Sequence, residues 1–172
     1  IKLMSSGHTN PEQTYQRFRR EAEATARLAH PNTVRVFDFG VTDTHELYMV
    51  MELLEGCDLS ARLKRGPLPL TEALGVVRQV MLALCEAHAL GIVHRDLKPG
   101  NVFLSRVHGG ESFVKVMDFG IAGIAPGHEG EKLTVTGAVL GTPAYMSPEQ
   151  AQGKGVDARS DLYSMGVMLF EM

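Results

Sequence analysis

The stretch that decides the fold is His94-Arg95-Asp96-Leu97-Lys98-Pro99-Gly100-Asn101. It lies in a polar loop between two short apolar pieces and contains an aspartate, a lysine and an asparagine in close succession. On a tight loop these three side chains can share one centre. Any three of these residues alone would fit a solvated loop of mixed charge, but the complete octet argues against that interpretation.

A second motif, Asp118-Phe119-Gly120, follows the apolar run 113–117, which we predict to be a strand. The Asp118 carboxylate then emerges at a strand end, and the glycine permits a turn directly after it. Phosphoryl transfer requires a base, metal ligands and cations in a fixed geometry, and the two motifs supply them in order. An isolated D-F-G tripeptide would be weak, but its spacing from Asn101 makes it specific.

The two motifs resemble the catalytic loop and the metal-binding segment of protein kinases. The resemblance implies that Asp96 orients the substrate hydroxyl or accepts its proton, and that Lys98 steadies the γ-phosphate. It also implies that Asn101 and Asp118 are metal ligands. The implied cofactors are ATP and Mg²⁺, with Mn²⁺ as an alternative metal.

The run Gly-Thr-Pro-Ala-Tyr-Met-Ser-Pro-Glu from residue 141 resembles the end of a kinase activation segment, with Ser147 where the family usually has alanine. Thr142 matches a family threonine that accompanies serine/threonine specificity. Arg95 resembles the arginine that pairs with a phosphorylated activation loop, for which Thr134 and Thr136 are candidates. Two loop threonines in water remain the alternative for that pair. Gly123 stands where many relatives have a basic residue.

Residues 10–29 have a helical pattern, with Phe18, Ala22, Thr25 and Leu28 on one face. Glu21 lies in the same stripe and needs a positive partner if it is buried, although an edge position in water is the alternative. Lys2 resembles the strand lysine of the kinase V-A-I-K motif, so we expect Lys2 and Glu21 to pair.

Residues 47–56 resemble the last strand of the small lobe and the hinge of a kinase. The resemblance implies that Met51 borders the adenine and that backbone groups of Glu52 and Leu54 bond it. Phe103 is placed to contact the adenine from below.

The apolar periodicity of the remaining sequence predicts the order of the other strands and helices. We predict a hairpin from strands 34–40 and 47–53, and a helix over 58–65 capped by Asp58. We also predict a second helix, capped by Thr71, that runs to residue 90 and is stopped by Gly91. The second helix should bury four residues, namely Leu74, Val77, Met81 and Leu84. Residues 123–141 show no period and are predicted to be a long surface loop, and short helices follow near Pro148 and from Asp161. Asp161 resembles the aspartate that supports the catalytic loop from beneath.

The composition limits the kinds of partner and metal that this protein is expected to bind. A net charge of −3 and a pI near 6.2 give no basic stripe for nucleic acid. Cys57 and Cys85 have no metal-ligand spacing and are predicted to be reduced thiols in a cytosolic fold, and the scattered histidines argue against zinc. No run is long and apolar enough for a bilayer span.

The expected fold class is α+β: a two-lobed protein-kinase fold with a partial small lobe, 1–54, and a partial large lobe, 55–172. The chain is expected to be a fragment, truncated at both ends and inactive alone, of a bacterial eukaryotic-type serine/threonine kinase. Expected partners are proteins bearing serine or threonine, and a second kinase copy for trans-autophosphorylation. The expected location is the cytoplasm or the cytoplasmic face of a membrane-anchored parent. The alternatives are an ATP-binding pseudokinase or signalling scaffold, and a small-molecule phosphotransferase.

Overall fold

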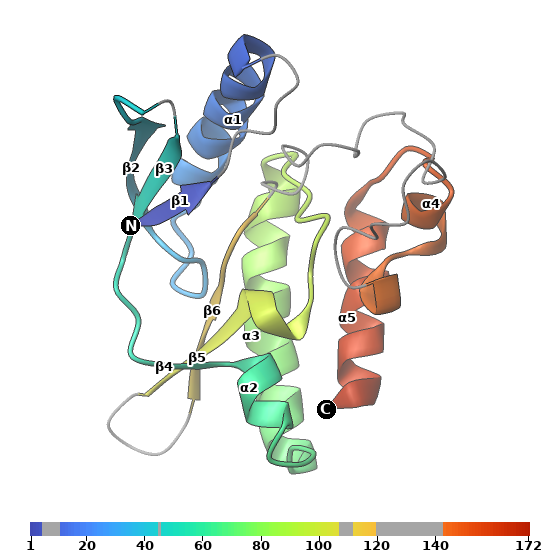
Figure 1. The fold of residues 1–172 in the computed structure, drawn as a ribbon. Coiled ribbons are helices and arrows are strands. Elements are labelled where there is room, and N and C mark those ends of the chain that lie inside the picture. The colour runs from blue at the N-terminus through green and yellow to red at the C-terminus, as the bar shows by residue number, and fades with distance from the viewer. Residues whose placement is uncertain (5–10, 45, 107–111, 120–142) are drawn as a thin grey trace.

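The computed structural model describes residues 1–4, 11–44, 46–106, 112–119 and 143–172 (Figure 1). In chain order its elements are β1 (Lys2–Met4), α1 (Pro11–Ala26), β2 (Val36–Val41), β3 (Leu47–Met51), β4 (Gly56–Asp58), α2 (Leu59–Leu63), α3 (Leu70–Ala89), η1 (Pro99–Asn101), β5 (Val102–Arg106), β6 (Ser112–Val116), η3 (Pro143–Tyr145), α4 (Pro148–Ala151) and α5 (Ala158–Glu171). Figure 1 shows α1 and the first three strands gathered at one end, while α3 and α5 stand side by side at the other.

The small lobe is an antiparallel sheet with strand order β1-β3-β2, covered by α1. Lys2 pairs in register with Met49 of the central strand. The core of the small lobe is a cluster of Phe18 and Ala22 from α1 with Leu47 and Met49 from β3, all nearly inaccessible to solvent. Burial of these apolar groups is the main favourable term that holds α1 on the sheet.

The large lobe is built around α3, which lies beside α5 and against β6. A second antiparallel sheet, in the order β4-β5-β6, carries the segments on either side of the candidate site. One buried cluster joins α2, α3, α5 and this sheet, and Phe119 belongs to it. The described elements therefore have the two-lobed α+β architecture that the sequence predicts.

The predicted apolar face of α1 is confirmed for Phe18, Ala22 and Thr25, which are buried. Leu28 is buried too, but α1 ends at Ala26, so Leu28 lies beyond the helix and belongs to the core cluster of the large lobe. The predicted cap of α2 is also confirmed, since the Ala61 N–H donates to Asp58 Oδ1 at 2.7 Å.

The prediction for α3 was partly wrong. The helix begins at Leu70 after Pro69, so Thr71 is not its cap. Leu84 is buried as expected, but Leu74 is exposed. The buried positions of α3 are Ala73, Val76, Val80, Ala83, Leu84 and Ala87. Three of these are alanines, whose small side chains let the helix approach the sheet closely, and a search for large apolar residues passes over them.

Candidate active site

A buried carboxylate helps to hold the loop of residues 92–98, between α3 and η1, on the large lobe. Asp161, in the first turn of α5, is 1% exposed. Its two oxygens accept the backbone N–H groups of His94 and Arg95, each at 2.9 Å. Its Oδ2 also lies 2.7 Å from His88 Nε2. The supporting role predicted for Asp161 is confirmed by these contacts.

Two residues beside the site have left-handed backbones without being glycine. Arg95 has φ of 68° and Asp118 has φ of 62°. Such conformations cost of order 1–3 kcal/mol and persist only where the surroundings enforce them. The strained positions lie directly before Asp96 and at Asp118, which are two of the predicted functional residues.

The structure brings together Asp96, Lys98 and Asn101. The Lys98 ammonium lies 2.7 Å from Asp96 Oδ2, and the Asn101 amide nitrogen lies 3.1 Å from the same oxygen. The Asn101 nitrogen also donates to the Asp96 carbonyl at 2.7 Å. The 3₁₀ turn η1 creates this convergence by folding the chain back after Pro99. Asp96 and Lys98 remain partly accessible, as side chains that meet a substrate must be.

A buried neutral histidine underlies this loop. His94 is fully buried, and burial lowers the pKa of its imidazole below the usual value. Its Nε2 lies 2.8 Å from the Met117 carbonyl, and because a carbonyl only accepts, Nε2 carries the proton. Nδ1 is then free to accept the Asp96 N–H at 3.3 Å. The ring also contacts Phe119, with ring centroids 4.8 Å apart.

Asp118 is where the two lobes meet. Its carboxylate follows β6 and lies 2.6 Å from the Lys2 ammonium of β1, with side chains 20% and 39% exposed respectively. The pairing of Lys2 with Glu21 that the sequence led us to expect remains a prediction. Glu21 lies on α1, and its carbonyl accepts the Thr25 hydroxyl at 2.9 Å. The same hydroxyl lies 3.1 Å from the Phe119 carbonyl, which ties α1 to the residue after Asp118.

The predicted hinge contains an ion pair that the sequence did not reveal. Glu52 Oε1 lies 2.6 Å from the Lys115 ammonium of β6 and accepts the Arg35 N–H at 2.8 Å. Lys115 also donates to the Thr33 carbonyl at 3.3 Å. A lysine within the apolar run 113–117 was the only available signal for this contact.

The other predicted adenine contacts lie near the hinge. Met51 packs against the core of the small lobe, Leu54 is partly buried, and Phe103 pairs with Asp58 and Lys115 in the second sheet. At Gly56, with φ of 148°, a Cβ would lie 2.1 Å from a backbone oxygen of β5, so the end of the hinge requires glycine.

Several predicted regulatory residues lie outside the described residues: Gly123, Thr134, Thr136 and Thr142. Arg95 is described, and its side chain is exposed. Its backbone carbonyl accepts the Gln150 side-chain amide of α4 at 2.6 Å, another contact that sequence reasoning missed.

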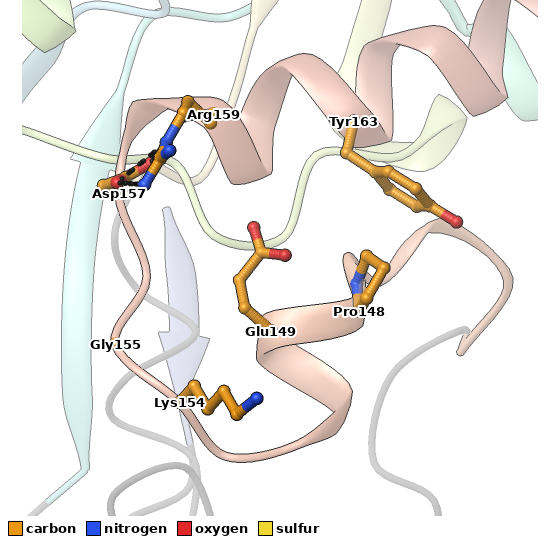
Figure 2. Close-up of a pocket in the computed structure, with 7 residues that line it drawn as sticks. All are labelled: Pro148, Glu149, Lys154, Gly155, Asp157, Arg159 and Tyr163. Atoms are coloured by element: carbon orange, nitrogen blue, oxygen red, sulfur yellow. Dashed lines mark hydrogen bonds and ion pairs between the residues drawn. The ribbon is translucent and has the colours of Figure 1, made fainter.

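A surface pocket of about 440 Å³ lies between α4 and α5 (Figure 2). It is lined by Pro148, Glu149, Lys154, Gly155, Asp157, Arg159 and Tyr163, none of which is a predicted site residue. Glu149 accepts a hydrogen bond from the Ser160 hydroxyl, which holds the pKa of that carboxyl below its usual value. The residues that the sequence predicts for phosphoryl transfer, including Asp96 and Asp118, do not line this pocket.

The donor atoms at Asn101 and Asp118 fit a divalent cation. Both bonds of the Asn101 side chain to Asp96 use its amide nitrogen, so its amide oxygen is the atom that could bind a metal. Asp118 contributes carboxylate oxygen, and such oxygens are the ligands that Mg²⁺ prefers. Among the described residues, no group of three or more His, Cys, Asp or Glu side chains is placed to hold a metal.

Comparison with known proteins identifies the class. The family model for the protein kinase domain matches residues 1–172, so the chain belongs to the protein kinase domain family. Members of this family use ATP together with a divalent metal ion.

Three bacterial relatives illustrate the similarity. The chain is 45% identical to serine/threonine-protein kinase pkn3 of Myxococcus xanthus, over 100% of this chain and 32% of that protein. It is 49% identical to PksC of Streptomyces coelicolor, over 91% of this chain and 29% of the relative. It is 42% identical to PknB of Mycobacterium leprae, over 100% of this chain and 27% of that protein. The chain therefore spans about a third or less of the length of these relatives. No helix in the described part of the chain has the length and apolar character to span a bilayer.

Proposed function

We propose that this chain is the catalytic core of an ATP-dependent protein serine/threonine kinase of the bacterial eukaryotic-type class. The observation that carries the proposal is the convergence of Lys98 and Asn101 on one oxygen of Asp96, at 2.7 and 3.1 Å. The printed names of pkn3, PksC and PknB, each a serine/threonine-protein kinase, support it. The complete set of site residues favours an active kinase over a pseudokinase scaffold.

Asp96 is the proposed base and orienting group for the protein hydroxyl. Lys98 and Asn101 both contact its Oδ2, so they fix the orientation of the carboxylate. When the hydroxyl oxygen attacks the γ-phosphorus, its proton passes to Asp96 while the bond from phosphorus to the β–γ bridging oxygen breaks. Lys98 offsets the negative charge that develops on the transferred group.

Asn101 and Asp118 are the proposed metal ligands, with Mg²⁺ as the expected ion and Mn²⁺ as the alternative. The bound metal would neutralise phosphate charge and fix the phosphate orientation. Lys2 contacts Asp118 in the structure, which supports a place for its ammonium beside the α- and β-phosphates. Glu21, on the neighbouring face of α1, is the proposed partner of Lys2 in the active state.

The hinge is the proposed adenine site. Backbone groups of Glu52 and Leu54 would bond the base, while Met51 and Phe103 would contact its faces. The ion pair of Glu52 with Lys115 at 2.6 Å supports this, because it holds the hinge backbone in one position. We also place the boundary between the lobes at residue 54.

Regulation would act through Arg95, whose exposed side chain is suited to bind a phosphorylated residue. Thr134 and Thr136 are the proposed phosphorylation sites, modified by a second copy of the kinase, and Thr142 is the proposed determinant of serine/threonine specificity. The protein would act in the cytoplasm or at its membrane face.

The test is transfer of labelled phosphate from ATP with magnesium by the complete natural protein, to itself and to a generic basic protein. We expect label on serine or threonine in the wild type and a loss of at least about 1,000-fold in Asp96→Asn, since the base is removed. Asp43→Asn makes the same chemical change at an exposed turn residue and should retain full activity. Equal activity in Asp96→Asn and wild type would refute the proposal. ATP-dependent thermal stabilisation without any transfer would identify a pseudokinase.

A further inference from the structure

The peptide that joins Arg95 to Asp96 is held in a strained position. Arg95 has a left-handed backbone with φ of 68°, and its N–H donates to Asp161 Oδ1 at 2.9 Å. A strained non-glycine residue relaxes unless neighbouring groups fix it on both sides. The N–H contact fixes only one side, so the position of Asp96 depends on what holds the following peptide plane.

Both polar groups of that peptide, the Arg95 carbonyl and the Asp96 N–H, have hydrogen-bond partners. The Arg95 carbonyl accepts the Gln150 side-chain amide at 2.6 Å, and the Asp96 N–H donates to His94 Nδ1 at 3.3 Å. The contact with Gln150 is the shorter of the two and comes from α4, a different part of the chain.

The Gln150 side chain is itself fixed at its other end. Its Oε1 accepts the Ser147 N–H at 3.1 Å, while the buried Ser147 hydroxyl accepts the Gln150 N–H at 3.4 Å. This reciprocal arrangement is a capping box at the start of α4. The neighbouring residue, Glu149, belongs instead to the pocket between α4 and α5 (Figure 2). Of these two adjacent residues of α4, Gln150 contacts the loop before Asp96 and Glu149 lines the pocket.

We infer that Gln150 is a positioning residue for Asp96, which acts by holding the Arg95 carbonyl and so orients the peptide plane from which Asp96 projects. The inference rests on the proposed function, in which Asp96 is the base. It adds a physical connection between the start of α4 and the catalytic loop, because the same glutamine takes part in the capping box of α4 and contacts Arg95. Displacement of this segment would then move Asp96.

The test uses three variants of the complete natural protein. Gln150→Glu keeps an oxygen for the capping box, in which glutamate is a usual partner, but removes the N–H that meets the Arg95 carbonyl. Gln150→Met removes the same donor without adding charge. Gln152→Glu makes the same charge change at the exposed end of α4 and is the matched control.

We expect kcat to fall by about 10- to 100-fold in both Gln150 variants, because small displacements of a catalytic group are costly. KM for ATP should stay near the wild-type value in both, since Lys2 and the hinge are untouched. The melting temperature should stay near the wild-type value in Gln150→Glu, which keeps the capping-box oxygen, and should fall in Gln150→Met, which loses that oxygen. Gln152→Glu should match the wild type in all three. Hydrogen exchange at the Asp96 amide should be faster in Gln150→Met than in wild type, because the peptide plane has lost one restraint.

A Gln150→Met protein with kcat within about twofold of wild type overturns the inference, as does an equal loss in Gln152→Glu. If the wild type itself transfers no phosphate, the proposed function fails instead. The role of Gln150 is then tested only by the rate of hydrogen exchange at the Asp96 amide. An unchanged exchange rate in Gln150→Met would then refute it.

Discussion

The catalytic loop and the contact between the lobes are held by different means. The loop depends on buried groups of the large lobe: Asp161 is 1% exposed and accepts two backbone N–H groups, and His94 is fully buried. The lobes meet at the ion pair of Lys2 and Asp118, whose side chains are 39% and 20% exposed. Solvent and salt screen such a pair, whereas they do not reach Asp161. The difference suggests a preorganised catalytic loop and an adjustable contact between the lobes.

The largest effect on stability should come from Asp161→Asn. An amide has only one oxygen acceptor, so one of the two backbone N–H groups loses its partner in a buried place. We expect a loss of roughly 2–4 kcal/mol in the free energy of unfolding, measured by urea denaturation. The control is Asp157→Asn, which keeps the cap of the same helix at an exposed position and should leave stability unchanged. Equal effects of the two variants would remove the basis of the comparison.

An intermediate effect is expected at the hinge. Lys115→Met should cost about 1.5–3 kcal/mol of unfolding free energy, because it leaves the Glu52 carboxylate without its charged hydrogen-bond partner. Combining Glu52→Gln with Lys115→Met should recover part of this loss, which a double-mutant cycle measures. Strict additivity of the two substitutions would contradict the coupling.

The buried histidine should make stability depend on pH. The pKa of His94 is below its usual value in the folded protein, so the unfolded state binds the proton first as pH falls. This contribution to stability is present above the unfolded pKa of about 6.5 and decreases below it, by at most about 1.4 kcal/mol per pH unit. Nitrogen NMR of the ring should show neutral imidazole, protonated at Nε2, at pH 6. A ring that titrates with an ordinary midpoint would contradict the burial argument.

The smallest effect on stability should come from Lys2→Met. The pair with Asp118 is partly exposed, so its loss should change the free energy of unfolding by less than about 1 kcal/mol. Phosphate transfer should nevertheless fall at least about 100-fold, since this ammonium is proposed to bind the phosphates. The activity measurement and the denaturation of the same sample, beside Lys154→Met at an exposed position, separate the two roles. A large loss of stability would show that the contact between the lobes is as fixed as the loop.

Sequence reasoning succeeded where the signal was local. The octet ending in Asn101 is short, so its spacing alone predicts that its polar side chains converge. In the structure, the side-chain nitrogens of Lys98 and Asn101 lie 2.7 and 3.1 Å from Asp96 Oδ2. The face of α1 was also predictable, since large apolar side chains mark it at helical period. For α3 the method failed in part, because alanines occupy half of the buried face and carry little periodic signal.

Contacts between distant segments were not predictable in the same way. Lys2 and Asp118, Glu52 and Lys115, and Gln150 and the Arg95 carbonyl all join different elements of the fold. A charged or amide side chain has several candidate partners in the sequence, and its choice depends on which elements pack together. The family resemblance predicted Glu21 as a partner of Lys2, but it did not predict the contact of Lys2 with Asp118, which depends on how β1 packs near the end of β6.

The sequence by itself determined the protein class, the convergence of Lys98 and Asn101 on Asp96 and the order of most elements, because these depend on residue types at short, fixed spacing. Only the tertiary structure decided which groups hold that loop and which carboxylate meets Lys2. Those contacts follow from the burial of apolar faces, which sets the distances between elements and thereby determines which polar atoms come within hydrogen-bond range.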